Sequence, residues 1–221
     1  MGAGLATSHL GPTHTSLDDI SLMRSIPGMT IFVPADAHEV RSIMPQTLDW
    51  NESIYIRLCK YGIPKYGESL NYKELAKPEL GKGLILNGGN VKNEILFVST
   101  GAMSPICLEV SNNLIKKNIA SRVLHISCIK PLDEKTIVEE SKKVKRVYFV
   151  EEHSGNGGLG TACIEALVKL IEPRNLPIMN KICLPNEFIH NYGDQKSVFS
   201  LFNLLPDQIT SKLLSDIKEI S

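Results

Sequence analysis

The first residue that could do chemistry is His14, which ends the stretch Gly-Pro-Thr-His at residues 11–14. Proline fixes the backbone angle φ and glycine permits close backbone approach, so the stretch predicts a stiff turn that presents the imidazole from a fixed position. An imidazole held in this way can contact a ligand. A histidine in a tight turn can also serve only to bond neighbouring carbonyl groups, and the residues alone leave both roles open.

Lys60 is the second candidate, because it follows directly after a predicted strand over residues 53–58. Open α/β sheets bind ligands just beyond the carboxyl ends of their strands, so a cation at this position could contact a ligand. The alternative is an ordinary surface lysine. Arg57 lies inside the same strand, and we expect it to form a structural ion pair instead.

A third candidate combines Glu151, Glu152 and His153 with the glycines of residues 155–160. The glycines fit G-x-G-x-x-G and lie between a strand and a helix, where a phosphate could bind. The two carboxylates would repel an anion, so we favour tight packing of helix on strand over nucleotide binding. Because neighbours on a strand point to opposite faces, we also favour a solvated or interface charge cluster over a metal site.

Helices and strands alternate around the first two candidates. Ser16 is expected to be the N-cap of one helix and Asp36 of the next. The order helix, strand, helix, strand indicates part of a parallel α/β sheet whose first strands are absent. The predicted elements are the helices 16–26 and 37–47 and the strands 29–34 and 53–58.

Residues 61–92 lose this periodicity and gather glycine, proline, lysine and asparagine, as a domain connection would. We place the boundary near residue 80, which gives a first domain over 1–80 and a second over 81–221, with a small hairpin around 84–86. Alternation then resumes, so a sheet with right-handed crossovers is the economical topology. The predicted elements are the strands 94–99, 122–126, 146–151 and 179–184 and the helices 103–117, 133–143 and 206–219, with one more helix ending near 171.

Composition narrows the class of protein. The 221 residues carry 24 basic and 24 acidic side chains, so no net field favours nucleic acid or an anionic membrane as a partner. The five cysteines form no C-x-x-C pair and indicate buried thiols in a reducing compartment. Neither a secretory leader nor an apolar run of roughly 20 residues is visible, so we expect a cytoplasmic protein.

The stretch 11–14 is followed by further residues that together resemble the pyrimidine-binding domain of the transketolase family of thiamine-diphosphate enzymes. Three later motifs are similar to the family's C-terminal domain. The last of them most resembles the separately encoded C-terminal subunit of split transketolases. The matching segments are 11–14, 19–20, 23–27, 30, 33–36 and 55–64 for the first domain, and 99–103, 129–133 and 150–160 for the second.

The resemblance implies an α/β fold, with a partial parallel-sheet pyrimidine-binding domain followed by a transketolase C-terminal-like α/β domain. It also implies a transferase of carbohydrate metabolism that moves a two-carbon ketol unit between phosphosugars through a thiazolium-bound carbanion. His14 would then be the catalytic residue, bonding the sugar or moving protons beside the thiazolium. Lys60 falls where transketolases usually place an arginine for the substrate phosphate, and lysine supplies the charge without the bidentate fork.

Two departures from the family pattern are visible. Leu10 stands where many transketolases carry an aspartate that contacts a sugar hydroxyl, which leaves the substrate preference open. The family's activating glutamate, its pyrimidine-stacking aromatics and its diphosphate- and metal-binding domain have no equivalent that can be assigned. The resemblance therefore implies that thiamine diphosphate and a divalent cation (Mg²⁺) are held mainly outside this chain, in a homodimer or with a separate diphosphate-binding subunit, and that the chain alone is inactive.

Two other hypotheses stay open. A deoxyxylulose-phosphate synthase or a 2-oxoacid dehydrogenase beta chain uses the same two domains, although the histidine motif argues against the dehydrogenase. A non-catalytic module that dimerises and docks a partner would need neither His14 nor Lys60.

Overall fold

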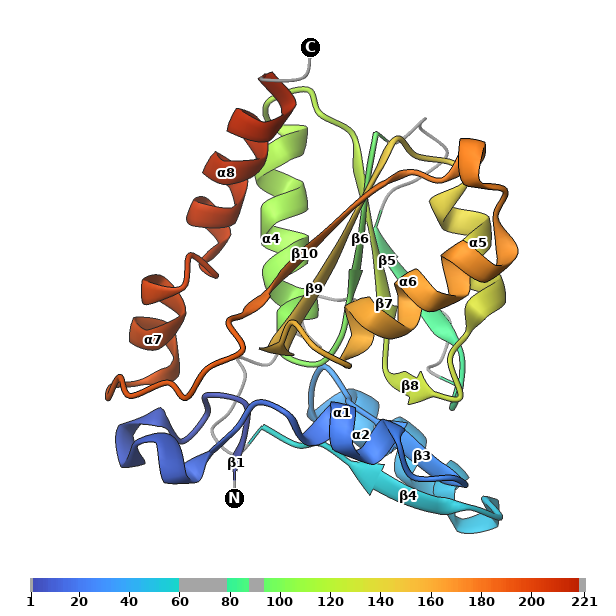
Figure 1. The fold of residues 1–221 in the computed structure, drawn as a ribbon, viewed down its shortest axis with the longest axis vertical. Helices are drawn as coiled ribbons and strands as arrows, with labels where there is room; N and C mark the ends of the chain where they lie inside the picture. The colour runs from blue at the N-terminus through green and yellow to red at the C-terminus, as the bar shows by residue number, and fades with distance from the viewer. Residues whose placement is uncertain (1, 60–78, 88–93, 219–221) are drawn as a thin grey trace.

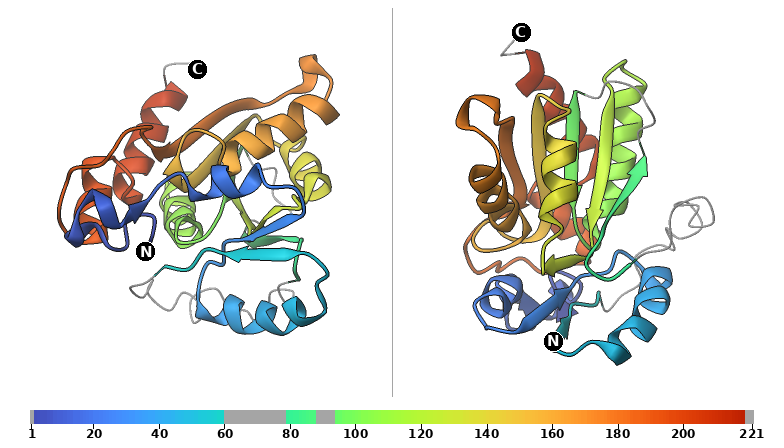
Figure 2. Two further views of the ribbon diagram at one scale, coloured as in Figure 1. Left: turned by 60° about the horizontal axis from the view of Figure 1, so that its bottom comes forward. Right: turned by 90° about the vertical axis from the view of Figure 1, so that its right-hand side faces the viewer.

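A larger sheet, with a smaller sheet at its carboxyl edge, organises the chain in the computed structural model, which describes residues 2–59, 79–87 and 94–218 (Figures 1 and 2). The smaller sheet confirms the predicted alternation in the first part of the chain. Its order is β4 (Ser53–Ile56), β3 (Met29–Phe32) and β8 (Cys128–Lys130). β3 and β4 are parallel, whereas β8 comes from the later part of the chain and pairs antiparallel with β3.

The helices of this first part are shorter than predicted. They are α1 (Asp19–Arg24) and α2 (Ala37–Ile43), and α2 continues into a 3-10 segment, η3 (Met44–Asp49). Asp36 caps α2 as predicted, because its Oδ1 accepts from the backbone N–H groups of His38 and Glu39, each at 2.9 Å.

The predicted N-cap at Ser16 is wrong. Ser16 lies in β2 (Thr15–Ser16), which pairs in parallel with β1 (Gly2–Ala3), and Asp18 takes the N-cap position of α1. The carbonyl of Ser16 accepts from the N–H of Gly4 at 3.0 Å and from Nη2 of Arg57 at 3.1 Å. These contacts hold the backbone extended, so the helix starts later.

The larger sheet has helices on both faces. Its order is β10 (Ile178–Leu184), β9 (Arg146–Ser154), β6 (Ile95–Ser99), β7 (Ser121–Ile126) and β5 (Gly83–Asn87). One face is covered by α4 (Met103–Ile115) and α8 (Pro206–Lys218), and the other by α5 (Glu134–Ser141) and α6 (Leu159–Leu170) (Figures 1 and 2). β10, β9, β6 and β7 are parallel, as the alternation predicts.

β5 corrects the hairpin expected around 84–86. It is an edge strand that pairs antiparallel with β7, with Leu84 opposite His125. The side chain of Asn87 extends the pairing, because its Oδ1 accepts from the N–H of Val123 at 2.8 Å. The short helix α7 (Gln195–Leu201) was not predicted.

Each face of the larger sheet has its own core. Val110 and Leu114 of α4 pack with Phe97 on one face, whereas Leu159 and Leu167 of α6 belong to the core of the other. The cysteine prediction is confirmed for three thiols, since Cys107, Cys128 and Cys163 are buried. Burial raises the pKa of Cys107 and of Cys128 to about 12, so both stay protonated and unreactive near neutral pH.

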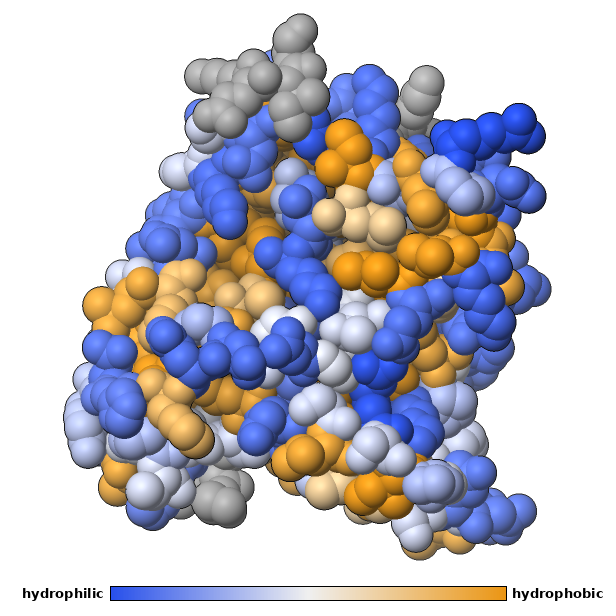
Figure 3. Space-filling model, viewed as in Figure 1, coloured by the Kyte–Doolittle hydropathy of each residue, from blue (hydrophilic) through white to orange (hydrophobic). Residues whose placement is uncertain are grey.

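The surface mixes polar and apolar side chains. Figure 3 shows apolar side chains gathered over the region of α6 and β10, where Val168, Leu170 and Ile178 are exposed. Across the described ranges, no helix combines the length and apolar character needed to cross a membrane.

Asp133 caps α5 and also ties it to β5. Its carboxylate accepts from the N–H of Thr136 at 3.2 Å, from the Thr136 hydroxyl at 2.7 Å and from the N–H of Gly83 at 2.9 Å. Burial raises the pKa of Asp133, but these donors outweigh burial and hold it below its ordinary value. We expect Asp133→Ala to lower the free energy of unfolding at pH 7 by about 1–2 kcal/mol in urea denaturation.

The Asp133 contribution has a defined pH dependence. Because the folded pKa lies below the unfolded value near 3.8, the contribution is present above that pH and is lost as the pH falls through the folded pKa. The stability difference between the wild type and Asp133→Ala is therefore expected to shrink in acid. A difference that grows on acidification would contradict this assignment. Asp194→Ala, which removes the exposed cap of α7, is the control and is expected to have a smaller effect.

Candidate active site

The carboxyl edge of the larger sheet meets the first part of the chain (Figure 1). Thr100, just beyond β6, donates from its hydroxyl to the carbonyl of Val33 at 3.4 Å. A Cβ at the neighbouring Gly101 would lie 2.9 Å from Cγ1 of Val33. Ligands commonly bind at this edge of α/β sheets. Here the smaller sheet and its loops cover this edge, and buried polar contacts hold them there.

Arg57 forms the ion pair predicted for it. Its Nε lies 2.8 Å from Oδ2 of Asp19, and both side chains are almost fully buried. The hydroxyl of Tyr55 donates to the same carboxylate oxygen at 2.8 Å. Burial raises the pKa of Asp19, but the guanidinium and the phenol outweigh burial and hold it below its ordinary value. Another nitrogen of the same guanidinium, Nη2, donates to the carbonyls of Ser16 and Glu152, each at 3.1 Å. Arg57 therefore joins the first part of the chain to β9 in the later part.

A solvated or interface charge cluster was expected at residues 151–153, and its solvated form is wrong, because all three side chains are buried. Glu151 accepts from the N–H groups of Leu159 at 2.7 Å and Gly160 at 2.9 Å, at the start of α6. Glu152 accepts through Oε1 from the N–H of Leu5 at 2.6 Å and from Nε2 of Gln195 at 2.8 Å. Burial raises the pKa of Glu152, and Arg57 only partly offsets this. Backbone donors at the start of α6 therefore make burial of Glu151 possible, and donors from distant segments make burial of Glu152 possible.

The glycines of residues 155–160 serve close packing, as predicted. A Cβ at Gly158 would collide with the carboxylate of Glu151, and one at Gly160 would lie 3.1 Å from Cβ of Phe149 on β9. The start of α6, where a phosphate could otherwise bind, is filled by Glu151.

A second buried chain of polar side chains crosses between the two parts. His125, on β7, places Nε2 at 3.0 and 2.9 Å from the two carboxylate oxygens of Glu39, on α2. Its Nδ1 lies 2.6 Å from the hydroxyl of Ser104, which lies 2.9 Å from that of Ser99. These polar contacts were not predicted from the sequence. The available signal was His125, which lies between the apolar residues Leu124 and Ile126 of a predicted strand.

His14 ends the 3-10 turn η2 (Pro12–His14), and its side chain is exposed. The Thr7 hydroxyl donates to the His14 carbonyl, and the ring Nδ1 lies 3.0 Å from Oγ1 of Thr13. The preceding turn is η1 (Ser8–Leu10). Ser8 donates from its hydroxyl to the carbonyl of Gly193 at 2.9 Å, so the later part of the chain holds this region in place.

Gly11 shows how closely the turn approaches the later part of the chain. Its φ is +84°, which favours glycine, and a Cβ there would lie 2.7 Å from Cε1 of Tyr192. A cavity of about 370 Å³ opens beside the turn, between Pro12 and Leu17 on one side and Phe188 and Ile189 on the other.

Lys60 lies outside the described residues. Its neighbour Cys59 is described, and Nε2 of Gln195 donates to Sγ of Cys59 in a long contact of 3.9 Å. Cys59, three residues after β4, and Leu5, which precedes the His14 turn, therefore contact the same pair of side chains: Cys59 contacts Gln195, and Leu5 contacts Glu152.

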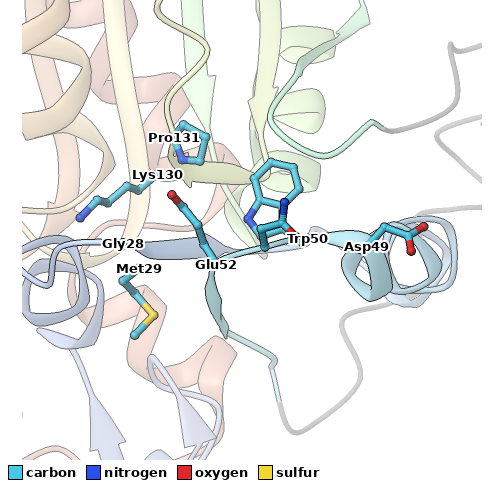
Figure 4. A pocket seen from close by; sticks show the side chains of 8 residues that line it. Gly28, Met29, Asp49, Trp50, Glu52, Lys130 and Pro131 are labelled. Carbon is cyan, nitrogen blue, oxygen red and sulfur yellow. The ribbon is translucent and has the colours of Figure 1, made fainter.

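A further cavity of about 520 Å³ lies at the amino ends of β3 and β4 in the smaller sheet (Figure 4). Trp50, Glu52 and Lys130 line it. Nζ of Lys130 donates to the carbonyls of Arg24 at 2.9 Å and Ile26 at 2.6 Å, so this cation already has partners. The cavity is separate from the His14 turn.

Two observations on the described residues bear on a diphosphate and its metal. Within 2–59, 79–87 and 94–218, no three His, Cys, Asp or Glu side chains form a group that could hold a metal ion. The glycine-rich start of α6 is filled by a carboxylate, which excludes a phosphate there.

The larger sheet, with helices on both faces, and the smaller sheet at its carboxyl edge define an α/β protein, and an exposed histidine turn lies in its first part. Family models specify it further. Residues 1–64 match the transketolase pyrimidine binding domain, and residues 81–209 match the transketolase C-terminal domain. The chain belongs to the transketolase family.

Relatives with described activities come from two branches of this family. The chain is 30% identical to one subunit of the apulose-4-phosphate transketolase of Phocaeicola vulgatus, covering 99% of this chain and 66% of that protein. It is 32% identical to 1-deoxy-D-xylulose-5-phosphate synthase of Natranaerobius thermophilus, covering 94% and 32%. The chain thus spans at most about two thirds of these relatives.

A solved structure described as a split gene transketolase, inactive beta4 tetramer, has the same fold. Its TM-score is 0.78 at 28% identity, and the match covers 97% of this chain and 63% of that one. The predicted fold class is therefore confirmed.

Proposed function

We propose that this chain is the C-terminal part of a transketolase-like enzyme that transfers a two-carbon ketol unit between phosphosugars. The observation that carries the proposal is the exposed His14, held on a fixed turn where the two family-matched parts of the chain meet. We divide the chain into domains near residue 80, as 1–80 and 81–221. The buried thiols support a reducing location, the cytoplasm.

His14 has the role of bonding a sugar hydroxyl or carrying a proton at its imidazole. Its ring is exposed, and its position is fixed through the backbone, so the ring nitrogens can reach a ligand. Lys60 has the role of binding the substrate phosphate as a point charge. Leu10 ends the preceding turn, η1, and is half exposed, and in the sequence it stands where many transketolases carry an aspartate that contacts a sugar hydroxyl.

Thiamine diphosphate and Mg²⁺ are proposed to be held mainly by parts outside this chain, because no group of His, Cys, Asp or Glu among the described residues could hold the metal and Glu151 fills the start of α6, the candidate phosphate site. Thiamine diphosphate supplies the carbanion chemistry when bound. The relative that is one subunit of an apulose-4-phosphate transketolase supports a two-subunit enzyme, and the tetrameric split transketolase supports self-association. The chain alone is then inactive.

The second candidate is a deoxyxylulose-phosphate synthase part, which the synthase relative favours. Product analysis of the chain mixed with its diphosphate-binding subunit separates the two. We expect turnover with a ketose phosphate as donor and an aldose phosphate as acceptor. Turnover with pyruvate as the donor instead would overturn the transketolase proposal.

A further inference from the structure

We propose that Glu152 and Gln195, both from the later part of the chain, are positioning residues for the turn that carries His14, the proposed substrate contact in the described part of the chain. The effect of these two residues on catalysis rests on the proposed function. Their effect on the position of the turn does not, and it can be tested independently.

Glu152 fixes the start of the segment that carries His14. Its Oε1 accepts from the N–H of Leu5 at 2.6 Å, and its side chain is 4% exposed. A side chain at Gly4 would collide with this carboxylate, so the backbone lies directly against it. Because the N–H of Ser8 donates to the carbonyl of Leu5 at 3.1 Å, a shift at Leu5 is transmitted into the turn.

The turn continues through a short series of backbone hydrogen bonds. The N–H of Gly11 donates to the carbonyl of Ser8 at 3.0 Å, and that of His14 to the carbonyl of Gly11 at 3.1 Å. The Thr7 hydroxyl donates to the His14 carbonyl. The path from Glu152 to the imidazole is therefore continuous and consists of described contacts.

Gln195 links Glu152 to a second segment, the residues that follow β4. Its Nε2 lies 2.8 Å from Oε1 of Glu152 and 3.9 Å from Sγ of Cys59, the residue before Lys60. Arg57 adds a second link, because its Nη2 donates to the Glu152 carbonyl. Glu152 and Gln195 thus contact both Leu5, which precedes the turn, and Cys59, which follows β4.

Hydrogen exchange of the full chain tests whether these contacts anchor the turn. In Glu152→Ala, we expect exchange at the amides of residues 5–14 to accelerate by about tenfold or more, because the bond that fixes Leu5 is lost. In Glu152→Gln, the amide oxygen can accept the same bond, so exchange is expected to stay within about twofold of the wild type. Gln195→Ala is expected to give an intermediate acceleration, and it provides the test if Glu152→Ala fails to fold.

Glu140→Ala is the matched control, because Glu140 is a buried carboxylate paired with Arg122 at 2.6 Å within the later part of the chain. It is expected to lower the melting temperature without changing exchange at residues 5–14. The proposal is overturned if Gln195→Ala and every folded Glu152 variant leave that exchange unchanged, or if Glu140→Ala accelerates it equally.

In the reconstituted enzyme, kcat/KM should follow the same order, with Glu152→Gln rescuing Glu152→Ala. A wild-type mixture without transfer activity would contradict the proposed function, whereas the exchange rates would still decide whether the anchor exists.

Discussion

His14→Ala is expected to lower kcat/KM of the reconstituted enzyme by about 100-fold or more while leaving the stability of the chain nearly unchanged. Positioned acid–base groups contribute about 10²–10⁴-fold, and 100-fold corresponds to about 2.7 kcal/mol of transition-state stabilisation. Stability is spared because the ring is exposed and the turn is held through backbone atoms and through Thr7, Ser8 and Gly11. Initial rates and urea denaturation of the same preparation measure both quantities.

His38→Ala is the control for this experiment, since His38 is an exposed histidine on α2 outside the proposed site, and its rates are expected to match the wild type. A loss of less than about tenfold in His14→Ala would favour the hypothesis of a non-catalytic module.

Arg57→Ala is expected to lower the free energy of unfolding by about 3–5 kcal/mol, the usual cost of removing one partner from a buried ion pair. It leaves the buried Asp19 carboxylate without its cation and removes the donor to the carbonyls of Ser16 and Glu152. Urea denaturation at pH 7 measures the loss. A loss below about 1 kcal/mol would contradict the role assigned to this pair.

The pH dependence of Arg57→Ala offers a further check. In the wild type, the pKa of Asp19 is held below its ordinary value, so the contribution of the pair is present above the unfolded pKa and is lost as the pH falls through the folded value. Without the cation, burial dominates and raises the folded pKa. The variant is therefore expected to lose stability relative to the wild type as the pH rises through the unfolded pKa of Asp19. Asp19→Asn combined with Arg57→Met removes both charges and is expected to recover part of the loss.

Sequence patterns predicted most of the regular elements because local chemistry determines them. Asp36 caps α2 as expected, α5 begins near its predicted start, and β-branched and aromatic residues mark β3 and β6. β8 was not predicted, since its three residues form a strand only by pairing with β3 from another part of the chain. Ser16 has good capping chemistry, but the long-range contacts of its carbonyl keep it in a strand.

The site was predictable only in part, for a related reason. The ion pair of Arg57 followed from a cation placed inside a strand, whereas the burial of Glu152 depends on donors at Leu5 and Gln195 that are distant in sequence. The same holds for His125 and its partner Glu39. Charged residues look solvated until their partners are known, so sequence patterns favour the wrong environment for them.

Calorimetric titration of thiamine diphosphate with Mg²⁺ most directly tests the central claim that this chain contributes substrate contacts while the cofactor is held mainly by parts outside it. The titration is made into the purified chain and into the chain mixed with its diphosphate-binding subunit. The account predicts binding with a dissociation constant on the order of micromolar only in the mixture. Micromolar binding by the purified chain alone would contradict it.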